Sequence, residues 1–378
     1  MDFSLSDDRR MLQETVERYV RDQYDHETRM KIAGSEDGTS KEKWAEMAEL
    51  GLIGAFLPEE AGGFGGAGYD IVVVMKELGR GLVVEPFLAT AAMGAGAVAL
   101  AGSDAQKEVL EEVIAGAKTL AFAHGEPASR YEYAHVETKA EKSGDGWTLN
   151  GAKAVVANGD SADMLVVSAR VSGAATDEDG LALFLVPADA AGVERRGYPT
   201  VDGYRAAEIT LKDVSVGADA VLGEPGEAYD VIEQVLARGV LALCAEAVGA
   251  METARDQTLD YLKQRNQFGQ AIGRFQALQH RMVDVCMEIE QANSAVTLAA
   301  AKLDAPRAER EKTLSAAKSL IGRVGRQVAE EAIQMHGGNG MTWEYAISHY
   351  AKRLTMIDHT LGDMDHHLER FIRFNRAA

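Results

Sequence analysis

Two segments of the chain combine charged or amide side chains with glycine in spacings that suit an anionic ligand. The first is RNQFG at 265–269, with Gln276 a short way beyond it. The second is QMHGGNG at 334–340, which ends a long helical pattern. Glycine-rich turns expose backbone N–H groups that can hold a phosphate or a ribose. Either segment alone is equally typical of an ordinary helix end, but the two together indicate a binding site.

A group of histidines and aspartates near residue 360 is a second candidate site. On one helix, His359, Asp363 and His367 would share a face at i, i+4 and i+8. That spacing could hold zinc or another divalent metal. A solvated polar helix face has the same pattern and is far more common, so we expect no metal here.

Residues 63–68, GFGGAG, match the dinucleotide fingerprint GxGxxG. That fingerprint needs a strand before it, a helix that begins on it and an acidic residue about 20 positions later. Glu85 lies near that distance, but the preceding pattern is helix and loop, and no βαβ unit surrounds the motif. We therefore expect a glycine-rich turn that joins two helices.

Three blocks of hydrophobic pattern must position these sites. Residues 1–118 follow a helical period. Residues 119–225 change to a period of two, and their six short runs without a helical interlude predict an antiparallel β-domain or small barrel. Residues 226–378 return to the helical period and predict a C-terminal four-helix bundle. Its expected helices cover 227–264, 275–303, 309–335 and 344–374. The expected fold class is therefore α+β and multidomain.

The composition restricts the class of partner. The 378 residues include 39 Lys plus Arg and 59 Asp plus Glu, which gives a formal charge of −20. Such a surface repels phosphate backbones and anionic lipid, so we expect neither nucleic-acid binding nor membrane-surface binding. The longest uncharged stretch, 86–102, holds three glycines and predicts a buried helix, so we also expect no membrane insertion. Cys244 and Cys286 lie in Ala/Leu/Met-rich stretches and predict no disulfide framework. The first residues do not resemble a secretory signal, and we expect a cytoplasmic protein.

The chain resembles the acyl-CoA dehydrogenase family of flavoenzymes over essentially its whole length. The segments that carry the resemblance are LGLIGAFLPEEAGGFGG, DGWTLNGAKAVVANGDSADMLVVSAR, RNQFGQAIGRFQALQHRM and QMHGGNGMTWEY. The resemblance implies a tetramer that binds FAD between the β-domain and the bundle. It also implies α,β-desaturation of an acyl-CoA thioester, in which a carboxylate base removes a proton and the flavin accepts a hydride. The reduced flavin then passes its electrons to another redox protein.

The resemblance also implies which residues bind the cofactor. In the family, an Arg-x-x-Phe-Gly segment and a Gln-x-x-Gly-Gly turn reach across a dimer interface to the pyrophosphate and adenosine of the neighbouring subunit's FAD. The matching residues of this chain are Arg265, Gln267, Phe268, Gln276, Gln334 and Gly338. This half of the family's FAD site is intact.

The positions that carry the catalytic base in the family hold residues that cannot accept a proton. The usual base in the C-terminal loop falls on Leu361, and the alternative base on the first bundle helix falls on Gly239. If a base has been recruited elsewhere in this chain, Asp363 and Glu246 are the candidates. No catalytic residue is therefore assigned from the sequence.

The side chains that face the flavin in the family are also missing. Val155 and Ala157 stand where relatives carry Trp and Thr, and HGEPASRY at 124–131 replaces the family's Thr-Glu-Pro-x-Ala-Gly-Ser-Asp. A stacking ring and a hydroxyl that would orient the flavin have become small apolar groups. The chain therefore keeps the residues that would contact the FAD of a neighbouring subunit and lacks those that would orient its own flavin and remove the substrate proton.

Three functions remain open. We favour the subunit that lacks the base in a heteromeric dimer of dimers, where it completes the FAD site of a homologous subunit. The chain resembles small subunits of two-gene members that act on bulky acyl-CoAs in lipid or steroid degradation, including pimeloyl-CoA dehydrogenase small subunits. The second is a self-sufficient homomeric FAD enzyme with a relocated base. The third is a flavin-free helical scaffold that binds a metal or a partner.

Overall fold

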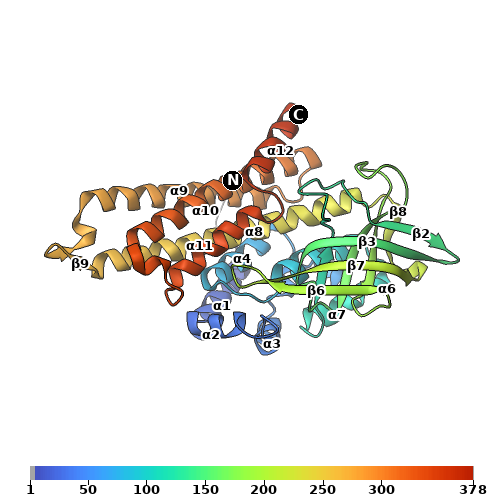
Figure 1. Ribbon diagram of the computed structural model, residues 1–378, viewed down its shortest axis with the longest axis horizontal. Coiled ribbons are helices and arrows are strands. Elements are labelled where there is room, and N and C mark those ends of the chain that lie inside the picture. The colour runs from blue at the N-terminus through green and yellow to red at the C-terminus, as the bar shows by residue number, and fades with distance from the viewer. Residues whose placement is uncertain (1–4, 378) are drawn as a thin grey trace. The chain divides into compact units, whose positions relative to one another are not determined.

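The computed structural model describes residues 5–377, which form two compact units (Figure 1). The helical unit comprises the residues up to Lys31, Gly68–Val83 and those from Val240 onward. The mixed unit comprises Ile32–Ala67 and Val84–Gly239.

Long helices build the helical unit. They are α1 (Asp7–Gln23), α2 (His26–Ala33), which runs past Lys31, α4 (Gly68–Gly81), α8 (Tyr229–Gln264), which begins in the mixed unit, α9 (Gln276–Ala301), α10 (Arg307–His336), α11 (Ala346–His359) and α12 (Met364–Ala377). The Ser6 hydroxyl accepts a hydrogen bond from the Arg9 backbone N–H and so caps α1. Helix α10 packs against α9, α11 and α12, so it forms the centre of this bundle.

The single helix expected over 344–374 was wrong, because the chain breaks between α11 and α12. Leu361 has φ +57° and Gly362 has φ +108°, and neither value is compatible with a right-handed helix. The buried Lys318 Nζ donates to the carbonyl oxygens of Asp358 and Gly362 at 2.9 and 2.6 Å. These contacts satisfy carbonyl groups that the helix break would otherwise leave buried and unpaired.

Short helices and a glycine-rich loop form the first part of the mixed unit. The helices are α3 (Lys41–Glu49), η1 (Gly54–Phe56), η2 (Glu59–Ala61), the π-helix η3 (Phe87–Gly94), α5 (Ala95–Ala101), α6 (Asp104–Lys107) and α7 (Val109–Ile114). The loop GFGGAG follows η2 rather than a strand, which confirms a turn and not a dinucleotide fingerprint. A Cβ atom at Gly65 would collide with the Ala55 carbonyl oxygen, so glycine permits the close approach of two backbone segments.

An eight-stranded sheet forms the rest of the mixed unit. The strands are β1 (Leu120–Ala123), β2 (Lys139–Ser143), β3 (Gly146–Ala157), β4 (Met164–Arg170), β5 (Leu181–Pro187), β6 (Val193–Pro199), β7 (Arg205–Val216) and β8 (Val221–Gly226), with the short η4 (Ala218–Ala220) before β8. Their order is β6-β7-β3-β2-β4-β5-β8, and β1 lies beside β4. Most pairs are antiparallel as expected, but β1 and β2 both run parallel to β4.

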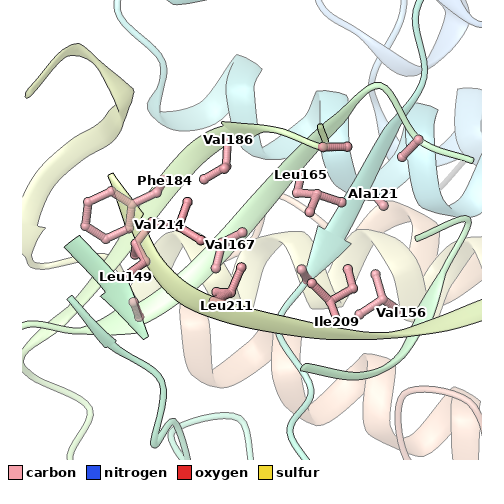
Figure 2. Packing of buried hydrophobic residues seen from close by; sticks show 14 of the residues in the cluster. Ala121, Leu149, Val156, Leu165, Val167, Phe184, Val186, Ile209, Leu211 and Val214 are labelled. Atoms are coloured by element: carbon pink, nitrogen blue, oxygen red, sulfur yellow. The ribbon is translucent and has the colours of Figure 1, made fainter. Parts of the chain in front are cut away.

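Side chains from alternate positions of these strands form the core of the sheet (Figure 2). The cluster includes Leu165 and Val167 of β4, Phe184 of β5 and Ile209 of β7, and all four side chains are fully buried. Burial of each such side chain contributes about 1.5–3 kcal/mol to folding. The period of two in the sequence therefore reports a sheet with one face in a shared core, and the expected order of helical, β and helical segments is confirmed.

Two further expectations concern the cysteines and the membrane. Cys244 and Cys286 are both free thiols, and burial raises the pKa of Cys244 to about 12. Within residues 5–377, none of the helices combines the length and the apolar character that a membrane crossing requires.

Candidate functional site

The RNQFG segment forms a tight hairpin just after α8. Strand β9 (Asn266–Gln267) pairs with β10 (Gln270–Ala271), and Phe268 and Gly269 make the turn with φ +53° and +80°. Two successive positive φ angles are typical of a type I′ turn, in which a bulky residue such as phenylalanine is strained. The Phe268 side chain is nevertheless 90% exposed. A strained and exposed aromatic ring at a hairpin tip is typical of a binding surface.

Arg265 lies at the base of this hairpin, and its exposed guanidinium is available to bind a ligand. Its backbone is anchored, because its N–H donates to the Tyr261 carbonyl and its own carbonyl accepts from Ile272, both at 2.8 Å. Its exposed side chain makes no hydrogen bond or ion pair with any residue from 5 to 377. Gln267 and Gln276 are exposed on the same connection. An unpaired guanidinium with five donors suits a phosphate or a carboxylate.

The QMHGGNG segment forms the end of α10 and a 3₁₀ turn, η6 (Gly337–Met341). Gly337 has φ +62°, and a Cβ atom at Gly337 or Gly338 would meet no atom within 4 Å. The backbone of this turn is therefore open to the approach of a ligand. Gln334 is exposed one helical turn before it.

The structure brings the two segments to the same end of the helical unit. The ring of Tyr261, near the end of α8, lies 4.4 Å from the ring of His336, at the end of α10. Asn339 Nδ2 donates to Tyr261 Oη at 3.4 Å, and Leu262 packs with Met335 in one apolar cluster. Figure 1 shows the β9 hairpin at the tip of α8 and α9. The sequence motifs therefore lie on one continuous surface, which we call the half-site.

The two positions at which the sequence led us to expect the family's base hold no proton acceptor. Leu361 is half-buried in the loop between α11 and α12, and Gly239 is buried in α8. Arg238, beside Gly239, is buried and donates to the carbonyl oxygens of Gly66 and Ala92 at 3.1 and 3.3 Å. Ala237, on the other side of Arg238, is equally unable to accept a proton.

Asp363 is engaged as a helix cap. Its Oδ1 accepts a hydrogen bond from the His366 backbone N–H at 2.9 Å, at the first turn of α12. Aspartate is among the preferred residues at such a position because it pairs an N–H group that has no partner inside the helix. The carboxylate therefore has a structural task.

Glu246 is engaged in a buried ion pair. Its Oε1 and Oε2 accept hydrogen bonds from Nε and Nη2 of Arg353 at 2.5 and 2.6 Å. Glu246 is 3% exposed and Arg353 is 4% exposed. Both candidates for a relocated base therefore hold structural contacts.

The expected polar face near residue 360 does not exist, because the helix break separates its members. His359 ends α11, and His367 is buried in α12, where it lies 2.9 Å from the Leu361 carbonyl through Nε2. Burial and the neighbouring Lys318 hold the pKa of His367 well below its usual value. Across residues 5–377, no three His, Cys, Asp or Glu side chains lie close enough to hold a metal ion.

The end of β3 carries Val155 and Ala157, the two residues expected at the flavin-facing positions. Val155 adopts φ +52° at a bulge between Lys153 and Val156 and is 63% exposed, and Ala157 is also exposed. A β-branched residue is rarely found in this conformation, so the backbone keeps a strained shape while its side chain offers neither a ring nor a hydroxyl.

A buried polar cluster behind this bulge was missed by the sequence analysis. Lys153 Nζ donates to Glu126 Oε1 at 2.7 Å and to Ser168 Oγ at 3.1 Å, and His124 Nδ1 lies 2.9 Å from Ser168 Oγ. Burial lowers the pKa of Lys153 to about 8 and, with Lys153, that of His124 to about 3. A lysine in an otherwise apolar strand was the available signal. The cluster holds the 124–131 segment against β3.

A β-domain between helical segments, with an exposed arginine and an open glycine turn at the end of a helical bundle, matches the architecture expected for a multidomain flavin-dependent dehydrogenase. Models of the acyl-CoA dehydrogenase N-terminal, middle and C-terminal domains match residues 6–117, 121–214 and 228–373. The chain belongs to the acyl-CoA dehydrogenase family, whose oxidoreductases act on CH–CH bonds. The expectation of FAD as the cofactor is confirmed at the level of the family.

Relatives match this chain along almost its whole length. It is 29% identical to the probable acyl-CoA dehydrogenase YngJ of Bacillus subtilis, over 98% of both chains. It is 30% identical to the short-chain specific acyl-CoA dehydrogenase of Megasphaera elsdenii, over 82% of this chain and 84% of the relative. Among solved structures, a variant of the Tcur3481-Tcur3483 steroid ACAD is 31% identical over 99% of both chains, with a TM-score of 0.88.

The residues of the half-site fit one part of FAD. Arg265 and the open backbone of the η6 turn suit the pyrophosphate and the adenosine, which carry negative charge and hydroxyl groups. The end of β3 does not supply a group that would orient a flavin ring. The residues of the half-site therefore suit the dinucleotide part of FAD, whereas the exposed side chains at the end of β3 offer neither a ring nor a hydroxyl.

Proposed function

We propose that this chain is the subunit that lacks the base in a heteromeric FAD-dependent acyl-CoA dehydrogenase. Its half-site binds the pyrophosphate and adenosine of the FAD that a homologous partner subunit holds. When bound, FAD supplies the hydride acceptor for α,β-desaturation of the acyl-CoA. The partner subunit supplies the carboxylate base, and an electron-transfer protein reoxidises the complex.

The observation that carries this proposal is the contrast between Arg265 and the four base positions. Arg265 is exposed and has no partner among residues 5–377, as a residue reserved for another subunit's ligand would be. Leu361 and Gly239 cannot accept a proton, and Asp363 and Glu246 already hold structural contacts. A self-sufficient enzyme would need one of these positions for catalysis, because general-base catalysis contributes about 10²–10⁴-fold.

The names of relatives support a heteromeric assembly. The Tcur3481-Tcur3483 steroid ACAD is named for two gene products, and a relative from Acetobacterium woodii, 29% identical, is the caffeyl-CoA reductase-Etf complex subunit CarC. We infer for this chain a homologous dehydrogenase subunit, a dimer of dimers and an electron-transfer acceptor. A steroid or another bulky acyl-CoA is the substrate class that we propose.

Flavin content tests the proposal. The chain is purified with the homologous dehydrogenase subunit that it captures, and FAD is counted per tetramer. We expect fewer FAD molecules than chains, and we expect Arg265→Ala to lower FAD affinity, because each charge-assisted hydrogen bond contributes about 1.5–3 kcal/mol. Arg326→Ala is the matched control, since Arg326 is an exposed arginine that pairs with Glu330 on α10. Full FAD occupancy of the isolated chain, with turnover of an acyl-CoA, would refute the proposal.

A further inference from the structure

Three aromatic rings connect the two segments of the half-site. The His336 ring lies 4.4 Å from the Tyr261 ring and 5.3 Å from the Tyr345 ring, and the two tyrosine rings are 6.3 Å apart. Tyr261 comes from α8, His336 from α10 and Tyr345 directly precedes α11. We call these residues the three-ring cluster.

His336 occupies the centre of this cluster without using its second nitrogen. Its Nδ1 lies 2.8 Å from the Ala332 carbonyl oxygen, and because a carbonyl can only accept, Nδ1 carries the hydrogen. Its Nε2 is buried and has no hydrogen-bond partner among residues 5–377. Burial lowers the pKa of His336, so the ring is neutral. What the ring contributes here is therefore its shape and its contacts with the two tyrosines.

Two of the three rings lie close in the chain to a group of the half-site. Tyr261 lies one helical turn before Arg265 and accepts the Arg265 backbone N–H at 2.8 Å through its carbonyl. His336 directly precedes Gly337 and Gly338. A Cβ atom at either glycine would meet no other atom within 4 Å. The three-ring cluster therefore relates the η6 turn to Arg265, together with the Asn339–Tyr261 hydrogen bond and the packing of Leu262 against Met335.

We propose that His336 is a positioning residue, whose ring fixes the η6 turn relative to Arg265 so that both reach one dinucleotide. The proposal rests on the proposed function, because the dinucleotide is the FAD of the partner subunit. A binding constellation has to be held within about 0.5 Å of its productive geometry, and a displacement of about 1 Å can cost two orders of magnitude. Loss of the buried ring therefore weakens FAD binding through the position of the turn.

Variants at position 336 separate the ring from its nitrogens. In the complex with its captured partner subunit, His336→Ala is expected to raise the FAD dissociation constant at least about 10-fold. His336→Phe keeps a ring and removes both nitrogens, and it is expected to stay within about 3-fold of the parent. His336→Asn keeps a donor for the Ala332 carbonyl without a ring, and it is expected to behave like His336→Ala. A phenylalanine variant as weak as the alanine variant would overturn the proposal.

A double variant tests whether His336 acts through the geometry of Arg265. If the ring positions the turn relative to Arg265, then His336→Ala should cost little more once Arg265 is already Ala. Additive losses of FAD affinity would overturn the proposal. If His336→Ala alone unfolds the chain, Tyr261→Leu removes the neighbouring ring and fills its space, and the same non-additivity with Arg265→Ala is expected.

The outcomes distinguish this inference from the proposed function. Unchanged FAD affinity in His336→Ala, with weakened affinity in Arg265→Ala, would refute the positioning role and leave the proposed function in place. Unchanged affinity in Arg265→Ala would refute the proposed function itself. Thermal unfolding of each complex without FAD provides the structural control. A positioning role predicts a weaker FAD affinity with an unfolding midpoint close to that of the parent complex.

Discussion

Glu246 of α8 and Arg353 of α11 form a bidentate ion pair inside the helical unit, with N···O distances of 2.5 and 2.6 Å. Both side chains are almost completely buried. Each carboxylate oxygen accepts a hydrogen bond from the guanidinium, so both oxygens of Glu246 are engaged in the ion pair. The pair fixes two bundle helices to each other.

Removal of one partner from this pair is expected to destabilise the chain. Glu246→Gln removes the carboxylate charge that pairs with the buried Arg353 guanidinium, and the break of such a buried pair costs about 3–5 kcal/mol of unfolding free energy. Urea unfolding measures the change. Glu288→Gln is the matched control, because Glu288 pairs with the partly exposed Arg323, and an exposed pair contributes at most about 1 kcal/mol. If Glu246→Gln keeps full stability but abolishes acyl-CoA turnover by the isolated chain, the self-sufficient enzyme is correct.

The capping role of Asp363 gives a second prediction. Asp363→Asn preserves a cap for α12 and should change stability little, whereas Asp363→Ala should cost about 1 kcal/mol. Neither variant should alter turnover by the complex, since the carboxylate serves the helix end. The thermal midpoint and the turnover rate are measured for both variants. A large loss of turnover in Asp363→Asn, at unchanged midpoint, would contradict the structural role.

The sequence predicted the architecture because hydrophobic periodicity reports which face of each element is buried. The change to a period of two near residue 119 marks the start of the sheet, and β4 and β5 place Val167 and Phe184 in one core. The parallel pairing of β1 with β4 was not predictable in this way, because periodicity does not report strand direction. That pairing depends on contacts between residues more than 40 positions apart.

The candidate site was predictable where it depends on local motifs and not where it depends on the surroundings. RNQFG and QMHGGNG are short segments, and their turn chemistry is visible in the residues themselves. The break at Leu361 was not visible, because the buried Lys318 from another helix stabilises it. The pairing of Glu246 with Arg353 joins residues 107 positions apart, so only the structure shows that this carboxylate is engaged.

Phe268 gives a prediction about strain. Its φ of +53° is unfavourable for a bulky residue, so Phe268→Asn should raise the unfolding free energy by about 1 kcal/mol. The same variant should weaken FAD retention by the complex, because the exposed ring belongs to the half-site. Phe268→Ala removes the ring but keeps the strain, and it is the control that separates the two effects. Unfolding of the isolated chain and FAD loss from the complex are the two measurements. An unchanged FAD affinity in both variants would show that the ring has no role in the half-site.

The last prediction concerns acid sensitivity and His124. Burial first, and then the charge of Lys153, lower the pKa of His124 from 6.5 to about 3. Between those values the unfolded chain binds a proton that the folded chain rejects, so stability falls as the pH falls from 6.5 towards 3, by an amount on the order of a few kcal/mol. His124→Asn retains a polar partner for Ser168 but cannot titrate. Urea unfolding at pH 7 and at pH 4.5 should therefore show a smaller loss for the variant than for the parent. The loss should shrink rather than vanish, because the pKa of the buried His367 is also lowered. Lys153 also makes the folded chain more stable as the pH rises, but in the alkaline range. Its pKa is about 8 in the folded chain against the ordinary lysine value of 10.5, so the free energy of unfolding rises between those pH values. An equal acid loss in parent and variant would show that His124 is not the group that resists protonation.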